Sequence, residues 1–215
     1  MRSRVWDLPL RIWHWLFALA VASCLLTGLS GDIGWMQWHQ RSGLLIIGLV
    51  VFRLGWGIWG GRYARLTHYR VSVAAIRDHF LRRLDPRVHT PPGIALAVAL
   101  FFLVLLQASA GLFTTDDIFN EGPLRRYVTD AFAGNATWLH HRVHWMISLF
   151  VVIHLTAQLI YGLWFRDPVW LSMVTGRKRV EAVRARDHFR RAVLTRLPQL
   201  WSYRSWRSRG SYSSR

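Results

Sequence analysis

The sequence predicts an all-α membrane protein, a four-transmembrane-helix bundle with both termini cytoplasmic. Its 215 residues include four long apolar segments of about 20 residues, the length that crosses a hydrocarbon core of roughly 30 Å at about 1.5 Å per residue. The formal charge of +17 is concentrated outside these segments. Four of the ten histidines lie within residues 138–165, and an ionisable side chain at membrane depth indicates a ligand, a proton path or a polar cavity.

The expected spans lie at about 12–30, 39–59, 93–113 and 138–165, within a membrane domain of residues 1–176 that precedes a basic tail, 177–215. The first is interpreted as a span rather than a cleaved signal peptide, because its apolar run continues past Cys24. The third has no charged residue and no histidine. It is therefore expected to serve as scaffold.

Basic residues cluster in the amino terminus, the 60–90 loop and the tail, and this distribution predicts that all three are cytoplasmic. Membrane lipid rather than nucleic acid is the expected partner of this charge, since it flanks apolar spans. Apolar residues at helical spacing over 73–84 are typical either of a helix lying on an anionic membrane or of an ordinary solvated loop helix. Both interpretations stay open.

Helical phase separates the histidines of the fourth span. His140 and His154 are fourteen residues apart, so they share one face at depths that differ by about 21 Å. His141 and His144 point elsewhere and are expected to be interface residues, partners of a cofactor carboxylate or part of a substrate pocket. Because they adjoin His140, ligation by one of them in its place remains an alternative.

Two further histidines lie on other spans and supply candidate second ligands. His14 begins the first span on the predicted inner side, and His39 begins the second on the outer side. The fourth span runs from outside to inside, which makes His140 the outer and His154 the inner histidine of that helix. The predicted pairs are therefore His14 with His154 and His39 with His140.

Two pairs of imidazoles in a membrane bundle predict two molecules of haem b. Zinc and copper sites usually recruit a thiolate, a carboxylate or a third imidazole, whereas a porphyrin iron needs only two axial ligands from the protein. With Cys24 as the single cysteine there is no Cys-x-x-Cys-His motif for covalent attachment. Arg53, buried in the second span, is expected to pair with an inner haem propionate, and Gly43 and Gly48 are expected to make room for a porphyrin face.

At these residues the chain resembles the bacterial di-haem cytochrome b561 family and the related cytochrome b subunits of nickel–iron hydrogenases. The resemblance covers about residues 4–180. Its matching pieces are Arg11-Ile12-Trp13-His14-Trp15, His39 with Gly43, His140 and His154 with Trp145, Gly111 to Asp117, Glu121-Gly122-Pro123-Leu124, and Pro168 to Arg177.

The resemblance implies a cytochrome of the bacterial inner membrane that transfers electrons between the quinone pool, ubiquinone or menaquinone, and a partner redox protein. The partner would be a cytochrome c or another periplasmic or membrane donor. Hydrogenase-type subunits usually have one span more than the four expected here.

Two alternatives remain, so an enzymatic activity is left open. The first is a self-contained superoxide:quinone oxidoreductase, in which Arg142, His141 and His144 would attract an anion beside the outer haem. The second is a non-redox membrane scaffold or metal-binding protein.

Overall fold

The computed structural model describes residues 2–4, 6–60, 64–65, 72–74, 76–77, 91–163 and 169–179. Four long helices dominate these residues: α1 (Leu8–Ser30), α2 (Ile33–Trp59), α4 (Pro91–Gly111) and α5 (Asp130–Leu163). All four are long and apolar enough to cross a membrane. The predicted all-α four-helix architecture is therefore confirmed for the described part of the chain.

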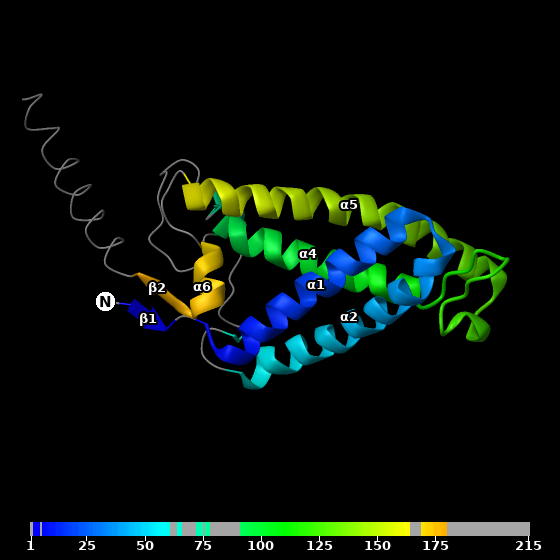
Figure 1. The fold of residues 1–215 in the computed structure, drawn as a ribbon, viewed down its shortest axis with the longest axis horizontal. Coiled ribbons are helices and arrows are strands. Elements are labelled where there is room, and N and C mark those ends of the chain that lie inside the picture. Colours follow the sequence, from blue (N-terminus) through cyan, green and yellow to red (C-terminus); the bar gives the residue numbers. More distant parts are fainter. Residues whose placement is uncertain are drawn as a thin grey trace, which may run out of the picture.

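The helices pair in chain order, α1 with α2 and α4 with α5, and α2 also contacts α4 (Figure 1). α1 and α4 run away from the end of the bundle that carries the chain's amino terminus, and α2 and α5 run back towards it (Figure 1). We call that end the strand end. The opposite end, where residues 112–129 connect α4 to α5, is the loop end.

All four long helices begin earlier than hydropathy predicts, and the difference is largest for α2 and α5. α2 starts at Ile33 rather than at 39, because Asp32 caps it by accepting a hydrogen bond from the Gly34 N–H at 2.8 Å. α5 starts at Asp130 rather than at 138, and its first two turns are largely polar or small. Hydropathy detects only the apolar part of such helices, whereas capping and backbone hydrogen bonding decide where they begin.

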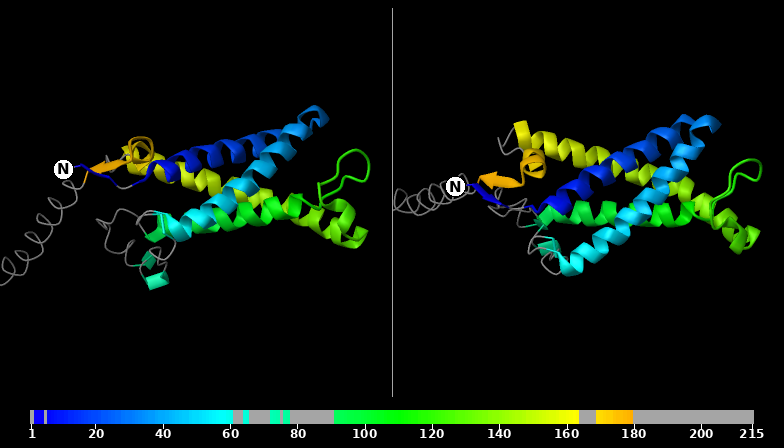
Figure 2. Two further views of the ribbon diagram at one scale, coloured as in Figure 1. Left: turned by 90° about the horizontal axis from the view of Figure 1, so that it is seen from below. Right: turned by 60° about the horizontal axis from the view of Figure 1, so that its bottom comes forward.

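Two short strands at the strand end were not predicted. β1 (Arg2–Arg4) pairs antiparallel with β2 (Arg177–Arg179), with Ser3 opposite Lys178. The short helix α6 (Val169–Thr175) precedes β2, and Gly176 joins the two with a positive φ of 72°. The first residues of the predicted tail are thus tied to the amino terminus, and Figure 2 shows both segments at the same end of the bundle. Residues 180–215 and most of the helix expected over 73–84 lie outside the described residues.

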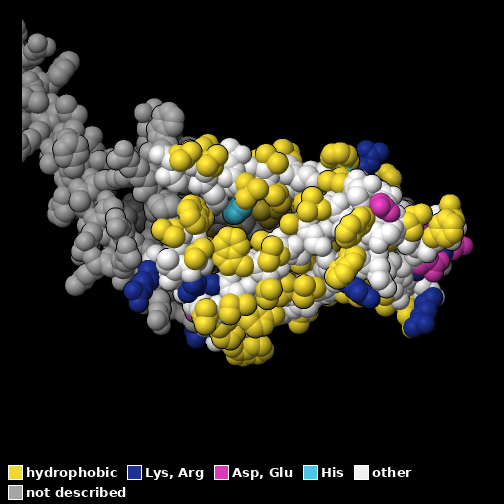
Figure 3. Space-filling view, viewed as in Figure 1, with side chains coloured by type: hydrophobic (Ala, Val, Ile, Leu, Met, Phe, Trp, Pro, Cys, Tyr) yellow, Lys and Arg dark blue, Asp and Glu magenta, His cyan; other side chains and the backbone are white. Residues whose placement is uncertain are grey.

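The interior of the bundle is a small apolar cluster to which every long helix contributes: Ala20, Ile46, Val50, Val104, Val143 and Ile147. Most other large apolar side chains of these helices are exposed. Figure 3 shows hydrophobic side chains over the middle of the molecule and charged side chains near its two ends. A surface of this kind is suited to lipid, because apolar contact with acyl chains replaces the burial that a soluble bundle would need.

Asp7 holds the beginning of α1 through both of its carboxylate oxygens. Oδ1 accepts a hydrogen bond from the Leu10 N–H at 3.0 Å, and Oδ2 accepts one from the Trp56 indole N–H at 3.1 Å. We expect Asp7→Ala to lower the free energy of unfolding by about 1–3 kcal/mol, since it removes a helix cap and a link to α2. Thermal unfolding in detergent measures this loss. Asp7→Asn, which keeps one acceptor oxygen, should lose less; equal losses would show that the capping bond contributes nothing.

Candidate functional site

The imidazoles of His39 on α2 and His140 on α5 lie together in the half of the bundle nearer the loop end. Their ring centroids are 6.0 Å apart and their planes meet at 82°. Two metal–imidazole bonds of about 2 Å, with about 1 Å from each nitrogen to its ring centre, add up to roughly 6 Å. The separation therefore suits two imidazoles that share one metal ion.

Hydrogen bonds determine which nitrogen of each ring is available. Nδ1 of His39 lies 3.0 Å from the Cys24 carbonyl oxygen, and Nδ1 of His140 lies 3.0 Å from the Gln107 carbonyl oxygen. Because a carbonyl oxygen only accepts, each Nδ1 must carry the proton and donate it. In a neutral imidazole, Nε2 then keeps its lone pair. This is the arrangement found in metal-ligating histidines, whose second nitrogen is held by a carbonyl or carboxylate.

Near the strand end, His14 on α1 and His154 on α5 are close enough for their rings to interact electrostatically. Both side chains are half-buried. Nδ1 of His14 is buried and has no hydrogen-bond partner, and its ring meets the Trp15 indole edge-on with centroids 5.4 Å apart. The structure thus places the rings of His39 and His140 against each other. It places His14 and His154 on α1 and α5 near the strand end, in the predicted order along α5, and ligation of iron by either pair stays a prediction.

His141 and His144 stand apart from the facing rings. His141 is exposed, with its centroid 6.4 Å from that of His140, and His144 is half-buried against the Trp145 ring at 4.7 Å. Neither is paired with a histidine of another helix among the described ring contacts.

Arg53 is buried in α2, with only 8% of its surface exposed. Its Nη1 donates to the carbonyl oxygen of Ala64 at 3.2 Å, and its guanidinium lies 5.7 Å from the centre of the Trp13 ring. Trp13 is held in turn, because its indole N–H donates to the Leu49 carbonyl oxygen at 2.7 Å. Arg53 therefore belongs to the contact between α1 and α2 in the half of the bundle nearer the strand end, where the sequence predicts a propionate partner.

Gly43 and Gly48 of α2 have open surroundings. A Cβ atom built on either glycine meets nothing within 4 Å. Among the described residues, no neighbouring helix packs closely enough to require glycine at these two positions. Their predicted role beside a porphyrin remains a proposal.

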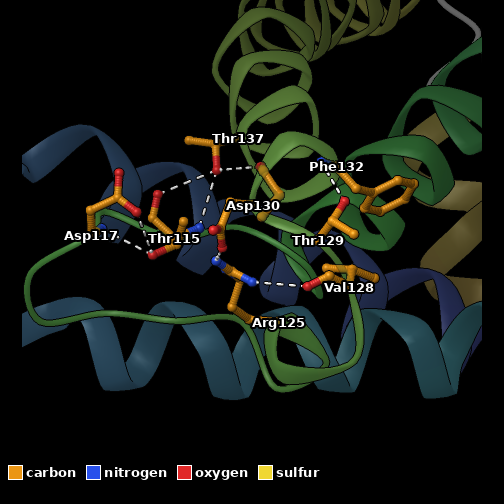
Figure 4. A network of polar contacts seen from close by, with 9 residues as sticks. Thr115, Asp117, Arg125, Val128, Thr129, Asp130, Phe132 and Thr137 are labelled. Carbon is orange, nitrogen blue, oxygen red and sulfur yellow. Dashed lines mark hydrogen bonds and ion pairs between the residues drawn. The ribbon is translucent and has the colours of Figure 1, made fainter.

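The connection between α4 and α5 folds back over the end of α4, close to His140. Leu124 N–H donates to the Leu112 carbonyl oxygen at 2.8 Å, and Thr137 of α5 exchanges side-chain hydrogen bonds with the backbone of Thr115 (Figure 4). Arg125 pairs with Asp130 and also donates to the Val128 carbonyl oxygen at 3.1 Å (Figure 4). The loop is thus attached to both helices that surround the outer histidine.

Asp116 organises the tip of this loop. Its carboxylate accepts hydrogen bonds from the side chain of Asn120 and from the backbone N–H groups of Ile118, Phe119 and Asn120, all within 3.0 Å. These donors favour the ionised form and lower the pKa of Asp116. They leave the side chains of Ile118 and Phe119 pointing out, each about three-quarters exposed.

Sequence reasoning missed the groups that hold the outer rings. The acceptors are backbone carbonyls of α1 and α4, and each ring also lies against a glycine, Gly28 or Gly111. The third span, expected to be scaffold alone, supplies one of these two supports. The recurrence of glycine near the ends of the first and third spans was the available signal.

The donor set fits a haem b iron at this position, because it offers two imidazoles that face one another and whose Nδ1 atoms are already held by carbonyl oxygens. Among the described residues, no three His, Cys, Asp or Glu side chains converge to hold a metal ion. A porphyrin iron needs only two such ligands, since the macrocycle supplies four nitrogens.

Comparison with known proteins agrees with this donor set. Residues 5–176 match the family model described as prokaryotic cytochrome b561. A probable Ni/Fe-hydrogenase B-type cytochrome subunit of Rhodobacter capsulatus is 22% identical, covering 81% of this chain and 80% of its own length. A probable Ni/Fe-hydrogenase 1 B-type cytochrome subunit of Escherichia coli K12 is 26% identical, and the match covers 80% of this chain and 88% of that protein. A probable Ni/Fe-hydrogenase B-type cytochrome subunit of Cupriavidus necator is 22% identical, and the match covers 80% of this chain and 85% of that protein. No solved structure matches significantly.

The family match spans most of the chain, including both histidine pairs and all four long helices. It agrees with the resemblance that the histidine-bearing motifs carry, and it argues against the non-redox alternative. The chain therefore belongs to the prokaryotic cytochrome b561 family, as a multi-pass membrane b-type cytochrome of electron transfer.

Proposed function

We propose that the protein holds two b haems and passes electrons across the membrane between the quinone pool and a partner redox protein. The observation that carries this proposal is the facing pair His39 and His140, whose Nδ1 atoms both donate to carbonyl oxygens. His39 and His140 would hold the outer haem, and His14 and His154 the inner one. When bound, each haem supplies a one-electron carrier.

The protein's own residues favour electron transfer over oxygen chemistry. Two histidines at each site would hold the haem iron and would leave no ligand position for a substrate molecule. Nδ1–H donation to a carbonyl makes an imidazole a more basic ligand and holds its ring in one orientation. His140 and His154 are fourteen residues apart on α5, about 21 Å along the axis, so this one helix would connect the two sites.

Residues of α2 would complete the haem sites. Arg53 offers a buried cation in the half of the bundle that contains His14, where an inner haem propionate would be neutralised. Gly43 and Gly48 offer a surface without side-chain atoms in the way of a planar ring. A quinone, either ubiquinone or menaquinone, would exchange electrons with one of the two haems.

The proposed orientation places the strand end in the cytoplasm and the loop end outside, in a bacterial inner membrane. It rests on the basic residues of the amino terminus, the 60–90 segment and the tail. β1, near the amino terminus, pairs with β2, so residues 2–4 and 177–179 lie at the same end of the bundle, as this orientation requires. The partner protein, a cytochrome c or another periplasmic or membrane donor, would approach the loop end. The names of the similar proteins add a hydrogenase as a candidate.

Purified protein tests this proposal directly. Its reduced-minus-oxidised spectrum should show a b-type α band, its haem-to-protein ratio should be two, and stopped-flow mixing with a quinol should reduce the haem. A ratio of one would contradict the two-haem assignment. Absence of haem reduction by both ubiquinol and menaquinol would remove the quinone pool as a substrate.

A self-contained superoxide:quinone oxidoreductase is the second candidate. The observation that favours it is the group of cationic or polar side chains beside the outer pair. His141 is exposed next to His140, and the guanidinium of the exposed Arg142 lies 5.7 Å from the centre of the Trp138 ring. Positive charge there would attract an anion. Haem reduction by superoxide faster than spontaneous dismutation, followed by quinone reduction, would support this activity; slower reduction would exclude it.

A further inference from the structure

The two outer histidines rest on matching supports in different helix pairs. A Cβ built on Gly28 of α1 would lie 3.0 Å from Cε1 and 3.2 Å from Nδ1 of His39. A Cβ built on Gly111 of α4 would lie at the same two distances from the same two atoms of His140. In each case the carbonyl that accepts from Nδ1 belongs to the residue four positions earlier, Cys24 or Gln107, at 3.0 Å.

This spacing has a simple geometric reason. In an α-helix the carbonyl of residue i points towards residue i+4, so a ring that donates to that carbonyl must pass over residue i+4. A Cβ at that residue would lie 3.0–3.2 Å from ring atoms, so glycine lets the ring keep its present position. We call the combination of a carbonyl and the glycine four residues later a glycine seat.

Backbone conformation does not account for these glycines. Among the described glycines, positive φ angles occur at Gly31 and Gly176, and neither Gly28 nor Gly111 is one of them. Glycine also disfavours helix formation relative to alanine. The structural requirement at both positions is therefore the space for the imidazole.

We propose that Gly28 and Gly111 are positioning residues for the two axial ligands of the outer haem. Each seat fixes the orientation of one imidazole ring. Together the two seats set the angle of 82° between the ring planes of His39 and His140. A methyl group in either seat moves the ring by a few tenths of an ångström, because contacts of 3.0 Å to ring atoms are too short. The hydrogen bond that Nδ1 donates to the carbonyl oxygen then weakens, and the plane of the imidazole ring turns. This inference rests on the proposed function, since it assumes that His39 and His140 bind iron.

The test compares Gly28→Ala and Gly111→Ala with matched glycine controls. Gly134→Ala on α5 places its methyl group where nothing lies within 4 Å, and Gly55→Ala on α2 meets Trp59 at an ordinary 3.5 Å. The readouts are the haem-to-protein ratio, the low-spin ferric EPR signal and the midpoint potential of each haem. The EPR signal reports on the angle between axial ring planes, which a change in fold stability alone does not alter.

In both seat variants we expect a shifted outer EPR signal and roughly 10- to 100-fold weaker outer haem binding, the usual effect of losing a support behind a metal ligand. The inner haem, retained in these variants, serves as the internal control for folding. Both control variants should keep both signals. An unchanged outer signal in the seat variants, a loss of both haems together, or an equal shift in Gly134→Ala and Gly55→Ala would overturn the proposal.

Histidine variants and glycine variants distinguish the proposed ligands from the proposed seats. If His39→Ala and His140→Ala keep both haems, the proposed ligands are wrong and the seats have no haem role. If those histidine variants lose the outer haem while Gly28→Ala and Gly111→Ala behave as wild type, the proposed function stands and the seats alone are rejected.

Discussion

His39→Ala protein and His140→Ala protein should each contain one haem where the wild type contains two. The centroids of the two rings are 6.0 Å apart, and each ring would supply one ligand to the same iron. Removal of either ring would leave that iron with one of its two protein ligands missing. His14→Ala and His154→Ala should each lose the other haem. Haem-to-protein ratios of the purified variants measure the loss, and redox titration shows which of the two potentials has disappeared.

The matched controls for this experiment lie on the same helix. His141→Ala and His144→Ala remove an imidazole close to His140 without removing a facing ring, and both should retain two haems. The double variant His39→Ala/His140→Ala should resemble either single variant, because both substitutions empty one site. If His144→Ala lost the outer haem and His140→Ala kept it, the ligand of α5 would have to be reassigned.

Arg53→Leu should destabilise the protein and lower the midpoint potential of the inner haem. The carbonyl of Ala64 is fully buried and accepts from Arg53, so the substitution leaves it without this donor at a cost of about 1–3 kcal/mol. If Arg53 neutralises a haem propionate, loss of its charge also makes the addition of an electron less favourable. Thermal unfolding and redox titration measure the two effects separately.

Arg53→Lys distinguishes charge from hydrogen-bond geometry. Lysine keeps the positive charge but lacks the planar guanidinium that lies over the Trp13 ring. We expect the potential to stay near that of the wild type while part of the stability is lost. An unchanged inner potential in Arg53→Leu would assign Arg53 to the packing of α1 against α2 alone.

Much of this arrangement can be predicted from the sequence because hydropathy and helical periodicity are local properties. Spans appear as apolar runs, and the fourteen-residue interval between His140 and His154 places both on one face whatever surrounds the helix. Alternation of direction across the membrane then orders His14 and His39 relative to them. The starts of α2 and α5 were placed too late, because capping by Asp32 and the polar first turns of α5 carry no hydropathy signal.

The sequence by itself determined the four spans and their alternating directions, since these follow from composition along one segment at a time. It predicted the two histidine pairs from the spacing on α5 and the order of the spans. Only the tertiary structure showed what holds the outer rings: the carbonyls of Cys24 and Gln107, with Gly28 and Gly111 beneath the imidazoles. The tertiary structure also showed that the strand Arg2–Arg4 pairs with the strand Arg177–Arg179. These contacts depend on how two helices cross and in which register they pack, and neither quantity is encoded in the pattern of a single segment.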